Sequence, residues 1–378
     1  MEVKLIESIT DIDSSEWNRL SGTDYPFLRH EFLSALERSG SVCQQSGWRP
    51  QHLLVYDGDE LAALMPLYLK FHSQGEYVFD HQWAHAYRQQ GLVYYPKWLT
   101  SIPFTPCQGD RIAIRNGKDT VKIMNTIFDY IQEASENEGI SSWHCLFPGV
   151  DQAQKLRSAG LNLRMGVQFH WHNQDYRDFD DYLDRFRASK RKQIKRERRR
   201  VTEQGIRFER VDGALISTRQ WQAFFEFYQM TYLKHGMHAY LNPAFFQQLA
   251  EAMPEQLLLV LAIKNSRTVG ASLSLIGADA LYGRYWGCFE EFNGLHFEAC
   301  YYQGLEFCIG SGLQRFDSGA QGEHKIARGF EPVYTYSAHW IKDPLMAQAI
   351  KHFLKREQKA IECYRNDAAS FLPFKRLT

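Results

Sequence analysis

The chain of 378 residues is longer than a single hydrophobic core usually grows, so two domains are the first expectation. Its 44 basic and 44 acidic residues cancel, which argues against a general electrostatic affinity for nucleic acids. No apolar run reaches the roughly 20 residues of a membrane span, no secretory leader opens the chain, and the seven cysteines lack metal or redox spacing, so we expect a cytoplasmic protein.

The first half alternates short strands and helices. Apolar periodicity and turn residues predict, in chain order, a strand over residues 2–8, helices over 14–20 and 25–40, a hairpin over 51–71 that turns at Asp57, Gly58 and Asp59, a helix from His81, extended backbone over 94–114, a helix over 120–137, a strand over 140–147, a helix over 149–160 and a strand over 161–173.

The second half repeats this order. The predicted elements are a basic helix over 185–200, a strand over 208–211, helices over 218–235 and 243–253, a hairpin over 257–277 that turns at Asn265 and Ser266, a strand over 280–288, a helix over 297–312, strands over 313–319 and 333–341, and a helix over 344–366. The echo is one of element order, not a short solenoid repeat. We therefore predict two mixed α/β domains, residues 1–173 and 174–378, with the basic helix at the start of the second.

The stretch from Phe316 to Phe330 concentrates charged residues among glycines, directly after a short apolar strand. Ionised groups are rarely buried unless paired, so a core requires no such loop, and glycine allows the backbone to turn tightly and approach a ligand. A solvated loop whose charges pair with one another would have the same composition. We predict a ligand loop: its reacting residues are Glu323, His324 and Lys325, and its substrate-binding residues are Gln321 and Arg328.

The segment from Leu281 to Gly304 is rich in aromatic and charged residues. On a strand, Tyr282, Arg284 and Trp286 would project to one face, where the arginine could stack or hold a phosphate or carboxylate. A cross-strand aromatic cluster with a snorkelling arginine is the alternative. We expect these three residues in a substrate pocket, together with three residues near the start of the following helix: His296, Glu298 and Tyr301.

Two further features carry weaker signals. His81 and His85 have the i, i+4 spacing of a metal pair, but Gln82 stands where the HExxH motif has its glutamate, so we predict no metal site. Residues 185–200 hold ten basic residues and one acid, which fits a solvated helix or a phosphate contact through Lys190, Arg191 and Lys192.

Several long segments together resemble the FemAB-like predicted N-acyltransferases, also labelled peptidoglycan biosynthesis or recognition proteins, within the GNAT superfamily. The resemblance runs from about Tyr25 to the end of the chain and is carried by HSQGEYVFDHQWAHAY, YYPKW, PFTPCQGDR, QFHWHN, SKRKQIKRER, LYGRYWGC, LHFEACYYQ and GAQGEHKIARGF. It implies two tandem GNAT-like domains and a bacterial acyltransferase that acts on an amine. His81 and Trp83 of the first half would then close the substrate pocket.

The resemblance leaves the donor open. Related Fem transferases use aminoacyl-tRNA and act on a peptidoglycan precursor, whereas ordinary GNAT enzymes use acyl-CoA. This chain has no clear Q/RxxGxG/A loop for CoA and no long coiled-coil insertion, and it has Lys234, His235 and Gly236 where a Lys-Trp-Gly-like run is expected. We expect no permanently bound cofactor, a small or carrier-linked donor, a possible tRNA contact through the basic helix, and, as the alternative, a binding module without catalysis.

Overall fold

The fold is described from a computed structural model, for residues 1–320 and 322–375. The chain forms two compact units, the first made of residues 1–167 and 334–364 and the second of residues 168–333 and those from 365 onward. The predicted split at residue 173 differs from this division, because residues 334–364 return to the first unit. There Ile341, Met346 and Ile350 share a buried cluster with Trp83 and Tyr87.

The first unit contains two groups of strands, in the orders β1-β3-β4-β7 and β15-β8-β6-β5-β2. Its elements are β1 (Glu2–Ile6), α1 (Ser14–Ser21), α2 (His30–Arg38), β2 (Trp48–Pro50), β3 (His52–Asp57), β4 (Glu60–Met65), β5 (Tyr68–Lys70), α3 (His81–Gln89), β6 (Lys97–Thr100), β7 (Ala113–Ile114), α4 (Thr120–Glu138), β8 (Ser142–Leu146) and α5 (Val150–Ser158), while β9 (Asn162–His172), β15 (Glu331–Ile341) and α12 (Pro344–Ser370) have residues in both units.

Local sequence explains these elements. The predicted hairpin is confirmed, since β3 and β4 pair from Leu53 to Glu60 around the expected turn. The Asp119 side chain caps α4 by accepting the Lys122 amide, and a left-handed glycine, Gly139, ends it. The apolar stripe of α4 joins a core that includes Trp98 and Trp143, on the parallel strands β6 and β8 that α4 connects.

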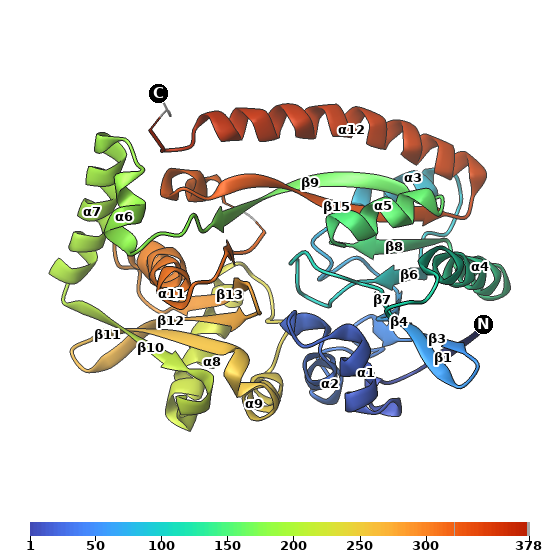
Figure 1. The fold of residues 1–378 in the computed structure, drawn as a ribbon, viewed down its shortest axis with the longest axis horizontal. Coiled ribbons are helices and arrows are strands. Elements are labelled where there is room, and N and C mark those ends of the chain that lie inside the picture. Colours follow the sequence, from blue (N-terminus) through green and yellow to red (C-terminus); the bar gives the residue numbers. More distant parts are fainter. Residues whose placement is uncertain (321, 376–378) are drawn as a thin grey trace. The chain divides into compact units, whose positions relative to one another are not determined.

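The second unit holds strands in the order β10-β11-β12-β13-β14-β9 (Figure 1). Its elements are α6 (Phe179–Asp184), α7 (Ala188–Glu203), β10 (Ile206–Asp212), α8 (Thr218–Lys234), α9 (Pro243–Ala252), β11 (Leu257–Lys264), β12 (Arg267–Ile276), β13 (Ala280–Cys288), α10 (Leu295–Phe297), a π-helical turn (Glu298–Tyr302), α11 (Gln303–Ser311), β14 (Arg315–Asp317) and a 3-10 helix (Glu323–Arg328). The β11–β12 hairpin confirms the predicted turn, with positive φ at Asn265 and Ser266. Among the described helices, none is both long and apolar enough to cross a bilayer.

Helices cover both faces of this second sheet. On one face the Tyr285 ring lies 5.4 Å from the Tyr228 ring of α8. A Cβ at Gly287 would stand 1.9 Å from the Phe227 carbonyl oxygen, so only glycine lets α8 approach this closely. On the other face Ser272 donates a hydrogen bond of 2.9 Å to a carbonyl of the π-helical turn. β13 therefore lies between two helical layers (Figure 1).

A chain of buried polar groups crosses the first unit. Asp80 stands at the N-cap of α3, yet its carboxylate makes no capping bond and instead accepts from Lys97 and, at 2.6 Å, from the Tyr94 hydroxyl. His144 Nε2 lies 3.2 Å from the Tyr94 hydroxyl oxygen and 2.8 Å from the Ser142 hydroxyl. His144 Nδ1 lies 2.6 Å from His339 Nδ1, so one of these nitrogens donates a proton to the other. Burial lowers the pKa of His144 to about 3 and that of His339 well below its usual value, so both rings stay neutral.

Acid should weaken the first unit through these two histidines. In the unfolded chain each ring takes up a proton near pH 6.5, whereas in the folded chain it does so only at much lower pH. Their contribution to stability is therefore present above pH 6.5 and lost as the pH falls, at up to about 1.4 kcal/mol per pH unit for each ring. We expect the free energy of unfolding in urea to fall more steeply from pH 7 to pH 5 for wild type than for the double variant His144→Asn/His339→Asn. Equal slopes would contradict this assignment.

Candidate functional site

The site begins where β13 and β14 separate. The two strands pair in parallel over three residues, Ala280–Tyr282 with Arg315–Asp317. β14 then ends, while β13 continues to Cys288. In the described part of the chain, no strand pairs with residues 283–288 on this side of β13. Two carbonyls of this segment accept from α8, that of Trp286 from the Thr231 hydroxyl at 2.8 Å and that of Cys288 from Lys234 at 3.3 Å. Backbone amides also need hydrogen-bond partners, so this edge can receive the acceptor groups of a ligand.

A cavity of about 160 Å³ lies at this separation. Four of the predicted substrate residues meet there: two from β13, and two from α10 and the π-helical turn that follows it. The cavity is lined by Ser272, Leu273, Ser274, Gly283, Arg284, Tyr285, Trp286, His296, Cys300, Tyr301 and Ser318. The structure thus brings Arg284, Trp286, His296 and Tyr301 together.

Tyr282 does not join them. The register of β13 against β12 shifts between Gly283 and Tyr285, so that Arg284 is an extra residue at a bulge. Tyr282 consequently shares a face with Tyr285, while Trp286 lies on the opposite face. The expectation that Tyr282, Arg284 and Trp286 project to one face was wrong for this reason. Tyr282 is buried, and its hydroxyl accepts a hydrogen bond of 3.1 Å from Arg315.

A second cavity, of about 510 Å³, shares lining residues with the first. Trp286 and His296 line both cavities. The end of α8 contributes Lys234 and His235 to the larger one, and Phe292 and Phe297 add aromatic surface. Trp286 and His296, whose ring centres are 5.7 Å apart, thus lie between the two cavities.

Three side chains with shifted pKa values meet beside the small cavity. The Tyr301 hydroxyl lies 2.8 Å from His324 Nε2, and the ring centres of His296 and His324 are 6.0 Å apart. Burial lowers the pKa of His296 to about 4 and, with the positive charges of Arg328 and Lys325, also lowers that of His324. Burial raises the pKa of Tyr301. At neutral pH two uncharged imidazoles, each with a lone pair, thus stand next to a protonated phenol.

The predicted reactive loop is a short 3-10 helix with its members in different surroundings. Lys325 is buried, and its ammonium donates a hydrogen bond of 2.6 Å to the Gly319 carbonyl, which closes the loop on itself. Glu323 is exposed at the start of the helix. Gln321 lies outside the described residues. The reacting roles of Glu323 and Lys325 stay predictions.

Arg328 anchors this loop instead of facing the cavity. Its guanidinium bonds Glu197 of α7 at 2.8 Å and the His324 carbonyl at 2.7 Å, and it lies 3.5 Å from the centre of the Phe297 ring. Glu197 also accepts the Tyr302 hydroxyl at 2.7 Å. One carboxylate of α7 therefore holds both the loop that carries His324 and the turn that carries Tyr301.

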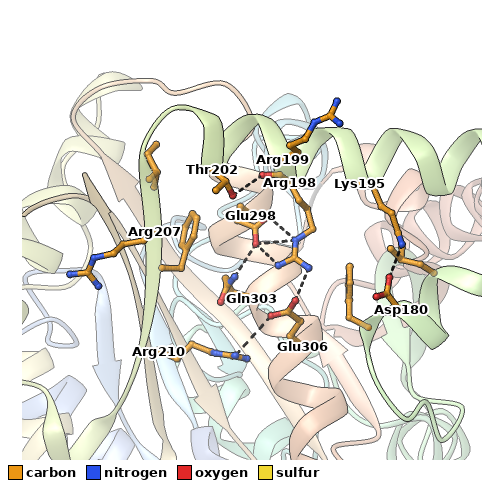
Figure 2. A pocket seen from close by; sticks show the side chains of 14 residues that line it. Asp180, Lys195, Arg198, Arg199, Thr202, Arg207, Arg210, Glu298, Gln303 and Glu306 are labelled. Carbon is orange, nitrogen blue, oxygen red and sulfur yellow. Dashed lines mark hydrogen bonds and ion pairs between the residues drawn. The ribbon is translucent and has the colours of Figure 1, made fainter. Parts of the chain in front are cut away.

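The next residue of α7 holds the other side of the same turn. Figure 2 shows Arg198 between Glu298, at 2.8 Å and 3.0 Å, and Glu306, at 2.6 Å. Gln303 also donates to Glu298, so this predicted substrate residue already has protein partners. Glu298 lines a different cavity from the one that Tyr301 lines, on the other side of the π-helical turn.

The predicted phosphate residues Lys190, Arg191 and Lys192 lie in the first turns of α7. Arg191 pairs with Asp184 at 2.9 Å. None of the three lines the cavity in Figure 2, to which α7 contributes residues from Lys195 onward. Their predicted role stays a prediction.

His81 and Trp83 both belong to α3 of the first unit. His81 is exposed. Trp83 is buried, with its ring 4.8 Å from the His339 ring, and the Arg164 guanidinium lies 5.3 Å from its centre. Their proposed part in closing the substrate pocket stays a prediction.

Sequence reasoning missed a buried acid and histidine beside the strand separation. Asp317 ends β14 and pairs in register with His170 of β9, and Asp317 Oδ2 lies 3.6 Å from His170 Nε2. Burial alone would raise the pKa of Asp317, but His170 and the Gly319 amide hold it below its usual range. Burial lowers the pKa of His170 to about 4. The available signal was an aspartate at the end of an apolar strand, directly before a glycine-rich loop.

Comparison with known families gives one match over nearly the whole chain. Residues 8–376 match the FemAB-like family, described as peptidoglycan biosynthesis/recognition. A search of curated proteins finds no match.

Solved structures show what the fold is similar to. The C-terminal domain of a protein from Agrobacterium fabrum described as a lysylphosphatidylglycerol synthetase has 10% identity and a TM-score of 0.55, covering 91% of this chain and 95% of that chain. FemX has 12% identity and a TM-score of 0.54, covering 93% and 100%. L-PGS from Bacillus licheniformis has 10% identity and a TM-score of 0.51, covering 88% and 97%. These likenesses and the mixed sheets confirm the predicted mixed α/β class.

The link between α7 and the loop can be tested by stability. Removing the Glu197 carboxylate leaves the buried Arg328 guanidinium without its ion-pair partner, so Glu197→Ala should lower the free energy of unfolding by about 3 kcal/mol. Glu203→Ala is the matched control on the same helix, because its partner Arg199 is exposed, and it should change stability by less than about 0.5 kcal/mol. Urea denaturation measures both. Similar losses of unfolding free energy in the two variants would show that Glu197 does not stabilise the loop through Arg328.

Proposed function

Because this chain belongs to the FemAB-like family of peptidoglycan biosynthesis/recognition proteins, we propose that it transfers an acyl or aminoacyl group to an amine where β13 and β14 separate. The observation that carries the proposal is the pair of cavities that share Trp286 and His296. One has room for a carrier, and the other, at an unpaired strand edge, has room for a small acyl group. The family supports a role in the cell wall, and the acceptor we propose is an amine of a cell-wall precursor.

In this proposal the acyl carbonyl lies along residues 283–288, where backbone N–H groups of β13 can stabilise the negative charge that develops on its oxygen. The amine attacks the carbonyl carbon, so a C–N bond forms while the C–O or C–S bond to the carrier breaks. A neutral imidazole, His324 or His296, takes the proton that the amine loses. That proton can then leave with the carrier.

His324 is the imidazole we favour as base. Its Nε2 is 2.8 Å from the Tyr301 hydroxyl, and the loop that carries it is fixed by Arg328 and Lys325. His296 is more deeply buried and lies between the two cavities, which suits a residue that positions the donor. Glu323, the other predicted base, and His324 are both exposed on the 3-10 helix, and the contact with Tyr301 is our reason for favouring His324.

The larger cavity would hold the donor's carrier. Lys234 and His235 can meet phosphate groups there, and Phe292 and Phe297 can meet a flat ring. CoA thioesters and the aminoacylated 3′ end of tRNA both carry an adenine ring and phosphates. The donor is one of these two kinds in our proposal, and both are cytoplasmic compounds.

Turnover should depend on His324. With a donor and acceptor identified by mass spectrometry from a panel of acyl-CoA thioesters, aminoacyl-tRNAs and amine acceptors, His324→Gln should lower kcat by about 10²–10⁴-fold, the usual contribution of general acid–base catalysis. His352→Gln, an exposed histidine of α12 in the first unit, is the matched control and should retain wild-type turnover.

Two outcomes would contradict the proposal. A loss of turnover in Glu323→Gln with full activity in His324→Gln would move the proton-accepting role to the glutamate. Tight binding of a donor and an acceptor without any product would favour a binding module over an enzyme.

A further inference from the structure

The largest of the described cavities in the second unit, about 730 Å³, lies beneath α7 and apart from the proposed transfer site. Its volume is within the roughly 300–1,000 Å³ typical of small-molecule sites. Its walls come from α6, α7, β10, the π-helical turn and α11, and it is lined by Phe179, Asp180, Leu183, Lys195, Arg198, Arg199, Thr202, Ile206, Arg207, Phe208, Arg210, Glu298, Gln303 and Glu306.

Five cationic side chains and three carboxylates line this cavity. Arg198 takes up two of the carboxylates, Glu298 and Glu306, in short ion pairs (Figure 2). Among the lining residues the cations therefore outnumber the carboxylates by two. An anionic ligand would relieve the mutual repulsion of the cations.

The ion pairs of the other four cations are weak and exposed. Lys195 bonds Asp180 at 2.7 Å, but the two side chains are 56% and 77% exposed. Arg210 reaches Glu306 only at 3.9 Å. Arg199 and Arg207 extend outward at the rim (Figure 2), where they pair with the exposed residues Glu203, at 3.3 Å, and Glu209, at 3.8 Å. Exposed pairs contribute about 0–1 kcal/mol, so a phosphate group can displace them at little cost.

The remaining lining suits the organic part of a ligand. Phe179, Leu183, Ile206 and Phe208 supply apolar surface. The Arg198 guanidinium already lies 4.7 Å from the centre of the Phe179 ring, which holds that ring in place. Apolar surface with a few polar groups at the edge is the usual composition of a site for a small organic molecule.

We propose that this cavity binds a small organic phosphate, with Lys195 and Arg210 on its phosphate groups, Arg199 and Arg207 at the rim, and Phe179 and Phe208 against its ring. A small ligand fits better than a nucleic acid strand, because a continuous backbone of phosphates would meet Asp180 and Glu306 as well as the cations. The site does not depend on the proposed transferase activity. If no ligand binds in this cavity, the proposal for the transfer site is unaffected. If the protein has no transferase activity, the proposal for this cavity is unaffected.

One π-helical turn lies between this cavity and the proposed transfer site. Glu298 lines this cavity, while Cys300 and Tyr301 of the same π-helical turn line the transfer cavity. π-helical turns of this kind occur often at functional sites.

Calorimetry on the full-length protein at 50 mM salt tests the proposal, with ADP, UDP and inorganic pyrophosphate as probes. We expect at least one nucleotide to bind more tightly than pyrophosphate. The double variant Lys195→Gln/Arg210→Gln should weaken that binding at least tenfold. The double variant Arg196→Gln/Arg200→Gln removes two exposed charges of α7 that do not line the cavity, and it should bind as wild type does. Thermal unfolding of each variant checks that the fold is retained.

Three results would overturn the proposal. One is the absence of binding by all three probes at 1 mM. Another is pyrophosphate binding as tight as that of the nucleotides, because the aromatic lining would then contribute nothing. The third is an equal loss of affinity in both double variants, accompanied by salt-sensitive binding of an RNA duplex, since this would make the outer surface of α7 a nucleic-acid contact.

Discussion

Two parallel strands that separate after three residue pairs leave backbone groups that some other partner must satisfy, and the second unit is arranged around this separation of β13 from β14. The bulge at Arg284 turns the end of β13 so that Trp286 faces the π-helical turn and not α8. Gly287 lets α8 press against the other face. The same strand therefore contributes a tightly packed core face and an open edge with a cavity beside it.

The basic helix α7 holds this arrangement through two neighbouring residues. Glu197 binds Arg328 on the loop, and Arg198 binds Glu298 on the π-helical turn. The Glu197 and Arg198 side chains are partly withdrawn from water. Their ion pairs therefore contribute more to stability than those of the exposed basic residues that make the helix conspicuous in the sequence. Glu197, the lone acid of the basic run, thus connects α7 to the loop and to the π-helical turn.

The sequence was a good guide to elements and a poorer one to contacts. Both hairpins, at Asp57 and at Asn265, follow from turn residues between apolar runs, and the echo between α4 and α11 appears as two parallel strand pairs, β6 with β8 and β13 with β14. The bulge could not be read, because an extra residue leaves no mark in an alternating pattern. The pairing of Asp317 with His170 was also hidden, because it depends on which strands become neighbours, as does the return of residues 334–364 to the first unit.

Backbone hydrogen exchange with a bound donor analogue tests most directly whether the separation of β13 and β14 is the transfer site. The analogues would be a non-hydrolysable acyl-CoA thioether and an aminoacyl-adenosine amide. The account predicts that one of them slows exchange in residues 283–288 and 294–301 while residues 257–264 of β11 remain unchanged. Binding that protects other segments and leaves 283–288 unaffected would contradict it.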